Sequence, residues 1–492
     1  MPMHPSPARL RSLLPLAAVL GPLLLLHGCV GDPDAGSMAV EPGLDPRVAQ
    51  WARDRHADDI AGRHLLQVEG APHEADETRA ALTSRGATVE WWHGPTGLAS
   101  VRGLDGDGIE GVARRPGVTV APDAVVGVLA EPRGARLLEE PSLAPQQAPN
   151  DTRPVPSNAR ELWRQWNLRA IGAPDAWEAG HLGSRDVTVA VVDTGIDDRH
   201  QDLDGRVDLE RSASFVPSDD ELVAEHFPDR HPVTDLHHHG THVAATIASN
   251  AAIAAGVTSS VTLIGVKVVG VEGEVQMSTL LRGILYAVDQ GAAVINVSIG
   301  GLFSRDGNEH WLKQIRTALG YAWVNGATVV VSAGNDEADM DSETHLFRAL
   351  CDAELAVCVS ATGAAQEMDS GDPDGADVDD FASYSNFGAA VDVSAPGGAA
   401  DSVWAACSGT SLEFEACRGR GDRILGLTGT SMAAPHVSGL AALLAGEHDG
   451  PDLWGRAVEV RRRLEASVVD LGEPGRDPRY GHGRIDMGEM DD

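Results

Sequence analysis

The sequence predicts an α/β protein: a large domain with a parallel sheet covered by helices on both faces, preceded by a small ferredoxin-like (α+β) module. Two observations carry this prediction. After residue 160, almost continuous apolar runs, typical of strands buried on both faces, alternate with helical segments. Upstream, short strand and helix patterns follow the order βαββαβ. With 492 residues and a hydrophobic fraction of 42%, the chain can hold more than one domain and bury a core.

The first 29 residues have the pattern of an export signal. Arg9 and Arg11 precede an apolar run at 13–26, which is too short to span a bilayer but suits a signal-peptide core. The run leads into Gly28-Cys29, which resembles the bacterial lipoprotein signal, in which the cysteine is lipidated and becomes the new N-terminus. The alternative is a plain secretory signal with an incidental cysteine. We therefore expect an exported protein, either a cell-envelope lipoprotein that meets the membrane only through Cys29 or a secreted or periplasmic protein.

Residues 30–62 read as a polar linker, and residues 63–130 as the small module. The predicted elements of the module are strands at 64–68, 87–92, 98–101 and 118–120 and helices at 74–84 and 107–115. Residues 131–160 are rich in proline and polar residues and have no apolar period, so they are predicted to be a linker in which a processing cut falls.

Residues 161–492 are predicted to form the large α/β domain. Its expected strands lie at 187–192, 261–269, 293–297, 327–331 and 355–359, and its expected helices at 243–249, 278–290 and 311–325. Residues 212–236 interrupt this alternation and read as a surface insertion.

The formal net charge of −35 excludes nucleic acid and bare anionic membrane as natural partners, because both would be repelled. The simplest interpretation of the charge is solubility. Carboxylates are also the usual oxygen ligands of calcium, so a structural calcium ion is compatible with the composition, although the sequence assigns no ligands to it.

Five cysteines are present, and four remain if Cys29 is lipidated. Four cysteines allow three pairings, of which the two local bridges, Cys351–Cys358 and Cys407–Cys417, close short loops and are favoured. Disulfides suit an oxidising compartment outside the cytoplasm, and four free thiols are the alternative.

Two motifs place an acid and a base near the edge of the predicted sheet. Asp193 directly follows a buried strand, where open α/β folds place their sites, although an N-cap or turn aspartate would look the same. His239 precedes an apolar helical run. Because His237, His238 and His242 are close to it, a metal cluster is the alternative, but no HExxH pattern or nearby cysteine pair supports zinc.

Two further motifs supply a nucleophile and a hydrogen-bond donor. Ser431 lies at the start of a long apolar helix, where the unpaired backbone N–H groups and the helix dipole favour negative charge. Asn335 ends a strand, from which its amide can donate to an oxyanion. A plain N-cap serine and an Asx turn are the alternatives for the two residues.

The order Asp193, His239, Asn335, Ser431, within the strings DTGID, HGTHVA, SAGN and GTSMAAPHVSG, resembles the subtilisin-like serine protease family (peptidase S8). The resemblance covers residues 166–487, and the module upstream resembles the family's inhibitory propeptide. It implies a serine endopeptidase with a subtilisin-like fold, made as a self-processed zymogen. The implied partners are polypeptide substrates and the chain's own propeptide, which would act as intramolecular chaperone and inhibitor. The implied chemistry requires no cofactor.

The resemblance also implies roles for individual residues. Asp193 would orient His239, which would take the proton from Ser431 and pass it to the leaving amine. The Asn335 amide and the Ser431 backbone N–H would hold the oxyanion. The residues implied to bind substrate around the P1 side chain are Ser298, Ile299 and Gly300, with Gly334 at the pocket floor.

Two other functions are compatible with parts of the sequence. One is a catalytically dead binding protein that keeps the fold, which would require a missing triad member. The other is a metal-binding surface lipoprotein built around the histidine cluster. Serine-directed labelling discriminates the first from an active enzyme, and metal stoichiometry discriminates the second.

Overall fold

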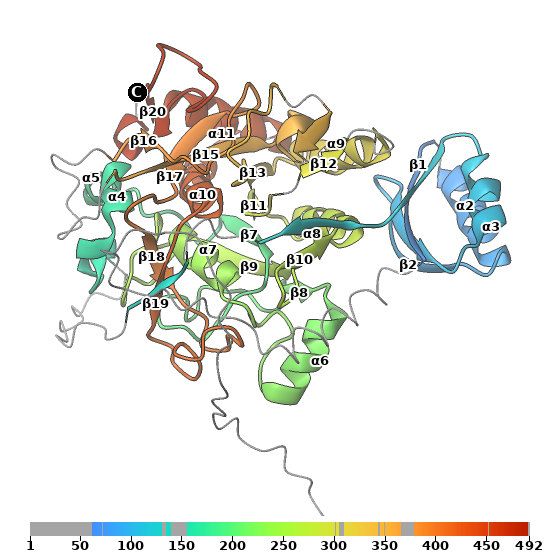
Figure 1. The fold of residues 1–492 in the computed structure, drawn as a ribbon, viewed down its shortest axis with the longest axis horizontal. Helices are drawn as coiled ribbons and strands as arrows, with labels where there is room; N and C mark the ends of the chain where they lie inside the picture. The colour runs from blue at the N-terminus through green and yellow to red at the C-terminus, as the bar shows by residue number, and fades with distance from the viewer. Residues whose placement is uncertain are drawn as a thin grey trace, which may run out of the picture. The chain divides into compact units, whose positions relative to one another are not determined.

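The computed structural model (Figure 1) describes residues 62–70, 72–129, 134–138, 155–300, 302–304, 309–342, 345–348, 350–365, 378–450 and 452–490. The predicted export signal, the polar linker up to residue 61 and Cys29 lie outside these residues. Among the described helices, none combines the length and the apolar character needed to cross a membrane.

A ten-stranded sheet forms the centre of the large domain. Along the sheet the strands run in the order β20-β21-β17-β15-β13-β11-β7-β9-β8, and β16 pairs with β15. The six longest are β7 (Thr188–Asp193), β9 (Thr262–Lys267), β11 (Val294–Val297), β13 (Thr328–Ser332), β15 (Val357–Gly363) and β17 (Val393–Pro396). All pairings among these six are parallel. Antiparallel pairs occur at β20 (Val468–Val469) with β21 (Arg484–Ile485) and at β16 (Asp380–Phe381) with β15.

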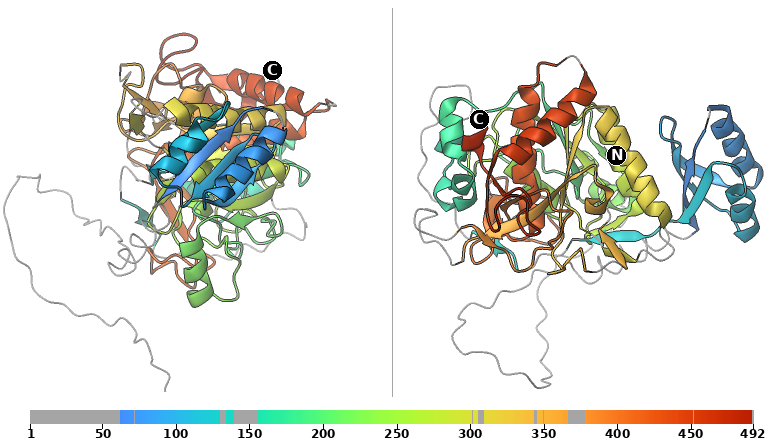
Figure 2. Two further views of the ribbon diagram at one scale, coloured as in Figure 1. Left: turned by 90° about the vertical axis from the view of Figure 1, so that its right-hand side faces the viewer. Right: turned by 90° about the horizontal axis from the view of Figure 1, so that it is seen from above.

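Helices cover both faces of this sheet (Figures 1 and 2). One face packs against α7 (His239–Ile247) and α10 (Thr430–Gly446), and α11 (Leu453–Ala466) lies against α10. The other face packs against α8 (Met277–Asp289) and α9 (Glu309–Val324). Because side chains alternate along a strand, Val189 and Val191 of β7 join the first core and Ala190 and Val192 the second. Every residue of β7 is buried, as the continuous apolar run predicts.

The strand order reverses beside β7. The chain passes from β7 to β9 on one side, then returns to β11 on the other and continues outward to β13, β15 and β17. In open parallel sheets, ligands bind outside the carboxyl ends of the strands at such a switch point. The residues that follow β7, β11 and β13 therefore lie where a functional site is expected.

The insertion predicted at 212–236 contains β8 (Ala213–Ser214) and α6 (Pro217–His226). It is not wholly a surface feature, because β8 extends the sheet by pairing in parallel with β9. The segment also supplies Asp219, whose carboxylate is 3.3 Å from the ammonium nitrogen of Lys267, and both side chains are buried. A two-residue strand has too few side chains to show a periodic pattern, so β8 could not be predicted from the sequence.

The small module has the predicted order βαββαβ. Its strands are β1 (Arg63–Val68), β2 (Thr88–His93), β3 (Leu98–Arg102) and β4 (Val118–Pro122), and its helices are α2 (Pro72–Ser84) and α3 (Gly106–Ala113). The strands form an antiparallel sheet in the order β2-β3-β1-β4, with a core that includes Leu66, Leu82 and Val101. On the opposite face of this sheet, Leu65 and Leu98 belong to the same apolar cluster as α8 and α9.

The linker prediction for 131–160 is wrong at both ends of its described part. Arg136–Leu137 form strand β6, which pairs with β19 (Ile424–Leu427), itself paired with β18 (Val403–Ala406). Near the other end, Pro156–Asn158 form a 3₁₀ turn and Ala159 joins the main core, so the packed domain begins before residue 161. Strand β6 depends on pairing with a distant strand, and Ala159 depends on packing against distant residues. Neither leaves a periodic pattern of apolar residues in the local sequence.

Short elements complete the described chain. They are β5 (Val125–Val128), β10 (Glu274–Gln276), β12 (Leu302–Ser304), β14 (Leu346–Arg348), α4 (Trp166–Ala170), α5 (Ala173–Ala179) and 3₁₀ turns at Leu162–Arg164, Cys351–Ala353 and Met487–Glu489. Both local cysteine pairings favoured by the sequence are present in the structure, Cys351–Cys358 and Cys407–Cys417. The second closes part of the loop between β18 and β19.

Candidate active site

An acid and a base meet at the carboxyl end of β7. Asp193 is the last residue of this buried strand and His239 is the first residue of α7. His239 Nδ1 donates to Asp193 Oδ1 at 2.8 Å, and the same oxygen accepts the backbone N–H of Thr194 at 2.7 Å. With the ring proton held on Nδ1, Nε2 is the basic nitrogen of His239. Both side chains are almost completely buried, which strengthens the interaction relative to water.

Asp235 fixes the positions of these two residues. Its carboxylate accepts hydrogen bonds from Thr194 Oγ1 at 2.9 Å, from Thr241 N at 2.9 Å and from Thr241 Oγ1 at 2.6 Å. Thr194 follows Asp193, and Thr241 lies in the first turn of α7, so one buried carboxylate ties the strand end to the helix start. Burial raises the pKa of Asp235 above its ordinary value. The sequence analysis missed this residue, because only the folded chain brings its partners together.

The candidate nucleophile lies at the start of α10. Gly429 precedes this helix with φ 154° and ψ 161°, a conformation essentially restricted to glycine. Ser431 Oγ donates to the carbonyl oxygen of Ser298 at 3.1 Å, and Ser298 Oγ donates to the carbonyl oxygen of Ser431 at 2.9 Å. Since Ser298 directly follows β11, this reciprocal pair fixes the start of α10 at the carboxyl end of that strand.

Asn335 is oriented by the same helix start. Its side-chain oxygen accepts from Thr430 N at 2.9 Å and from Thr430 Oγ1 at 2.8 Å. Thr430 Oγ1 in turn accepts from Gly334 N at 3.2 Å. With the amide oxygen bonded to Thr430, the amide nitrogen is the hydrogen-bond donor of the Asn335 side chain. Thr430 is a positioning residue that the sequence analysis did not single out, although it lies next to Ser431.

These contacts bring the predicted residues to one edge of the sheet. Strands β13, β11 and β7 are neighbours, and the residues after them bind the starts of α10 and α7. The two helices also pack against each other. Among the described residues, the acceptor of Ser431 Oγ is Ser298 rather than His239, so the serine side chain is turned toward the strand in this conformation.

The predicted substrate-binding residues lie on two facing segments. A Cβ added to Gly300 would lie 3.3 Å from Cα of Gly334, so the two backbones approach closely. Gly334 has φ +99°, and a Cβ there would meet the Asn386 amide nitrogen at 2.4 Å. Strand β5 of the small module contacts the first segment, because a Cβ on Gly127 would lie 2.8 Å from Ile299 Cγ2. A side chain at any of these three glycines would therefore force neighbouring atoms to move.

The four clustered histidines do not form one metal site. His239 bonds to Asp193, and His242 Nε2 lies 3.1 Å from the carbonyl oxygens of both Val403 and Leu425. Burial lowers the pKa of His242 to about 3, so this ring is neutral.

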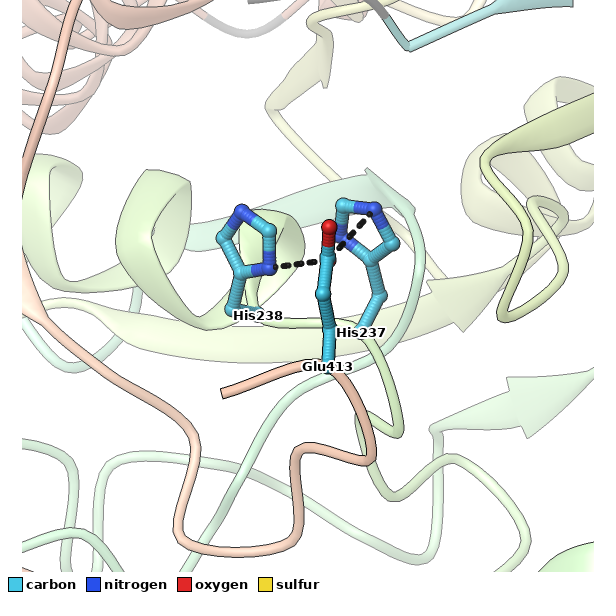
Figure 3. A group of neighbouring side chains, drawn as sticks. All are labelled: His237, His238 and Glu413. Carbon is cyan, nitrogen blue, oxygen red and sulfur yellow. Dashed lines mark ion pairs between the residues drawn. The ribbon is translucent and has the colours of Figure 1, made fainter. Parts of the chain in front are cut away.

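His237 and His238 instead face Glu413, and one oxygen of its carboxylate lies near a ring nitrogen of each histidine (Figure 3). Burial by itself raises the pKa of Glu413, but the hydrogen bond from His238 and the neighbouring histidines outweigh it, and the pKa is lowered. Two imidazoles and one carboxylate do not match calcium, which prefers oxygen ligands.

The model of the subtilase family matches residues 184–483. This stretch contains Asp193, His239, Asn335 and Ser431, which the structure gathers at one edge of the sheet. The chain belongs to the subtilase family. Subtilases are serine endopeptidases. The predicted subtilisin-like parallel sheet with helices on both faces is confirmed.

Named proteins similar to this subtilase include proteases from bacilli. The thermophilic serine proteinase of Bacillus sp. (strain AK1) is 32% identical over 310 residues, which are 62% of this chain and 62% of that protein. Subtilisin E of Bacillus subtilis (strain 168) is 32% identical over 324 residues, which are 65% of this chain and 70% of that protein. Thermitase of Thermoactinomyces vulgaris is 31% identical over 288 residues, 58% of this chain and 83% of that protein.

Solved structures support the same fold. The epidermin leader peptide processing serine protease from Staphylococcus aureus superposes with a TM-score of 0.66, covering 87% of this subtilase and 97% of that chain at 18% identity. A lanthipeptide protease superposes with a TM-score of 0.53, covering 67% of this chain and 95% of that chain at 25% identity.

The position of Asn335 predicts a large catalytic effect. Removing the corresponding amide of subtilisin lowers kcat by about 10²–10³, and we expect a loss of that order for Asn335→Leu with KM little changed. The measurement is steady-state hydrolysis of a peptide anilide by the mature enzyme. Asn325→Leu, at the end of α9, is the matched control and should retain activity. A loss below about fivefold in Asn335→Leu would contradict an oxyanion role.

Proposed function

We propose that this chain is an exported serine endopeptidase that hydrolyses peptide bonds through an acyl-enzyme intermediate. The observation that carries the proposal is the buried hydrogen bond from His239 Nδ1 to Asp193 Oδ1 at the switch point of the sheet, on the edge where α10 presents Ser431. The alternative, a catalytically dead binding protein, would lack a member of the triad, whereas this chain has Asp193, His239 and Ser431. The groups of this site are protein side chains and backbone amides, and the proposed chemistry requires no cofactor.

The reaction begins when substrate displaces the Ser431 hydroxyl from the Ser298 carbonyl. Ser431 Oγ then turns to His239 Nε2, which accepts its proton as the oxygen attacks the scissile carbonyl. Asp193 stabilises the imidazolium that forms, because its carboxylate is already bonded to Nδ1. The Asn335 amide and the Ser431 backbone N–H donate to the oxyanion. His239 passes the proton to the leaving amine, and water repeats the sequence on the acyl-enzyme.

We further propose that the small module is an inhibitory propeptide. Strand β5 pairs in an antiparallel manner with β10, Val128 opposite Glu274 and Gly127 opposite Val275, as an extended peptide does when it adds to a sheet edge. The pairing continues with the backbone N–H of Leu129, which donates to Gly273 O at 2.9 Å. The module therefore presents a peptide-like strand beside Ile299, in the region assigned to substrate.

The module also supplies a capping residue to a helix of the large domain. Asp123 accepts the backbone N–H of Ser278, in the first turn of α8, at 3.0 Å and accepts the Ser278 hydroxyl as well. An aspartate that binds the N–H groups of a helix start acts as its N-cap. Because Asp123 belongs to the module and α8 to the large domain, the cap supports a role for the module in folding that domain.

The proposed location is outside the cytoplasm. Two disulfides are the supporting observation, because such bonds persist in oxidising compartments. Attachment through a lipid on Cys29 and a structural calcium ion with unassigned ligands belong to the same proposal. Intact mass of the purified protein tests the lipid directly, since an acylated N-terminal cysteine and an unmodified one differ by the mass of the acyl chains.

A serine-directed fluorophosphonate tests the proposed activity. The self-processed protein should be labelled at Ser431 and should hydrolyse casein, because His239 makes the hydroxyl nucleophilic. Ser431→Ala should show neither labelling nor hydrolysis. Ser438→Ala, on the same helix, is the matched control and should be labelled. Absence of labelling in the unsubstituted protein after its module has been removed would favour a catalytically dead binding protein.

The position of the maturation cut follows from the two strands that bracket it. β5 pairs with β10 beside the substrate-binding residues, whereas β6 pairs with β19, the strand that leads into Ser431. We therefore place the maturation cut in the interval that separates these two strands, between Leu129 and Gly134. N-terminal sequencing of the mature enzyme should find a new terminus within this interval, and Ser431→Ala should remain uncut there. A terminus elsewhere in the linker would contradict this placement of the propeptide.

A further inference from the structure

A long loop between β18 and β19 brings Glu413 to His237 and His238, the two residues before His239. Three contacts fix the start of this loop to the segment before α7. Ser408 Oγ and Thr410 Oγ1 both donate to Asp235 O, at 2.7 and 2.8 Å, and Leu412 N donates to Leu236 O at 2.8 Å. The disulfide Cys407–Cys417 closes the loop around Glu413. The carboxylate is therefore held in place by the backbone that also positions His237 and His238.

The three side chains form a compact set of possible ligands. Glu413 Oε2 lies 2.9 Å from His238 Nδ1 and 3.3 Å from His237 Nε2, and one ligand atom from each residue falls within 4.8 Å of the others. Two ligands of a tetrahedral zinc ion, at about 2.0–2.1 Å from the metal, are about 3.4 Å apart. The two spacings to Glu413 are close to that value, and the third, between the two ring nitrogens, is within 4.8 Å, so side-chain movements are needed to admit an ion.

The surroundings also suit a bound ion. The rings of His237 and His238 are stacked, with centroids 4.1 Å apart and planes 17° apart, and Phe414 packs edge-on against His238. The side chain of His238 is 2% exposed, whereas those of His237 and Glu413 are 11% and 22% exposed. His238 is therefore packed inside the protein, whereas His237 and Glu413 are partly accessible to solvent. Its two imidazoles and one carboxylate are ligands that zinc and similar transition metals accept.

Metal binding at His237 would also change a contact of His239. The backbone N–H of His239 donates to His237 Nδ1 at 3.4 Å, a long hydrogen bond that requires Nδ1 to be the unprotonated nitrogen. If Nε2 of His237 binds a metal, the ring proton must be on Nδ1 instead. Two donors, this N–H and the backbone N–H of His239, then face each other, and the hydrogen bond between them is lost. The ring then has to move away, and the start of the helix that carries His239 loses a contact.

We propose that His237, His238 and Glu413 form a binding site for a divalent transition metal ion of the zinc class, and that an ion bound there slows peptide hydrolysis. The second half of this proposal rests on the proposed endopeptidase activity, whereas the first half does not. The site is separate from the catalytic residues, because none of its ligands takes part in the proposed proton transfers.

Binding is measured on the untagged full chain carrying Ser431→Ala, which removes self-digestion. Titration with zinc chloride by calorimetry should show one site, and cobalt(II) should give the visible absorption of a tetrahedral complex. Glu413→Gln removes the anionic ligand at nearly constant shape and should weaken binding by more than about tenfold. Glu415→Gln, in the same loop and exposed, is the matched control and should bind like the parent. Equal thermal melting of the three proteins establishes that folding is intact.

Inhibition is measured on the active mature enzyme with a peptide anilide. Zinc should lower kcat at least fivefold, reversibly on addition of a chelator, and Glu413→Gln should lose most of this sensitivity while Glu415→Gln keeps it. No zinc binding, or equal binding by Glu413→Gln, would overturn the site. Binding without any change in kcat would overturn the coupling. A chain that binds zinc through Glu413 but hydrolyses nothing would overturn the proposed function and leave the site standing.

Discussion

The hydrogen bond between Asp193 and His239 is the interaction on which the catalytic arrangement depends. It exists because β7 is a central strand, buried on both faces, that ends at Asp193. The strand order reverses beside it, which leaves an edge that the neighbouring strands do not cover. Asp235 then ties the strand end to the first turn of α7. A buried carboxylate so placed keeps the imidazole in one tautomer, and the acid-base chemistry of the enzyme follows from that tautomer.

The remaining catalytic groups are attached to this edge through the start of one helix. Ser298 exchanges hydrogen bonds with Ser431, and Asn335 accepts two from Thr430. The proposed nucleophile and the proposed oxyanion donor are thus fixed by the ends of β11 and β13, which are neighbouring strands on one side of β7. The same rigidity explains the glycines at this edge, since Gly300 and Gly334 leave no room for side chains between the two segments.

Much of this arrangement could be predicted from the sequence, for identifiable reasons. Buried parallel strands appear as continuous apolar runs, so β7, β11 and β13 were located, and the polar residues that end them were noted. The short strings around Asp193, His239 and Ser431 then indicated the family. Positioning residues could not be found in this way, because their contacts join separate segments: Asp235 bonds to Thr194, 41 residues away, and Glu413 contacts His237 and His238, more than 170 residues away. Strands β6 and β8 could not be predicted, because each has only two residues and depends on backbone hydrogen bonds to another strand. Two side chains are too few to show the alternation of polar and apolar residues that marks a strand.

The proposed mechanism requires Ser431 and His239 to reach the same substrate group, although the serine faces Ser298 in the present conformation. A peptidyl chloromethyl ketone tests this, since the hydroxyl must add to the ketone carbonyl while the imidazole displaces chloride from the adjacent carbon. Peptide mapping of the treated mature enzyme should find the alkyl group on His239, and Ser431→Ala should escape alkylation. Alkylation at another residue, or modification of His239 at the same rate without the serine hydroxyl, would contradict the account.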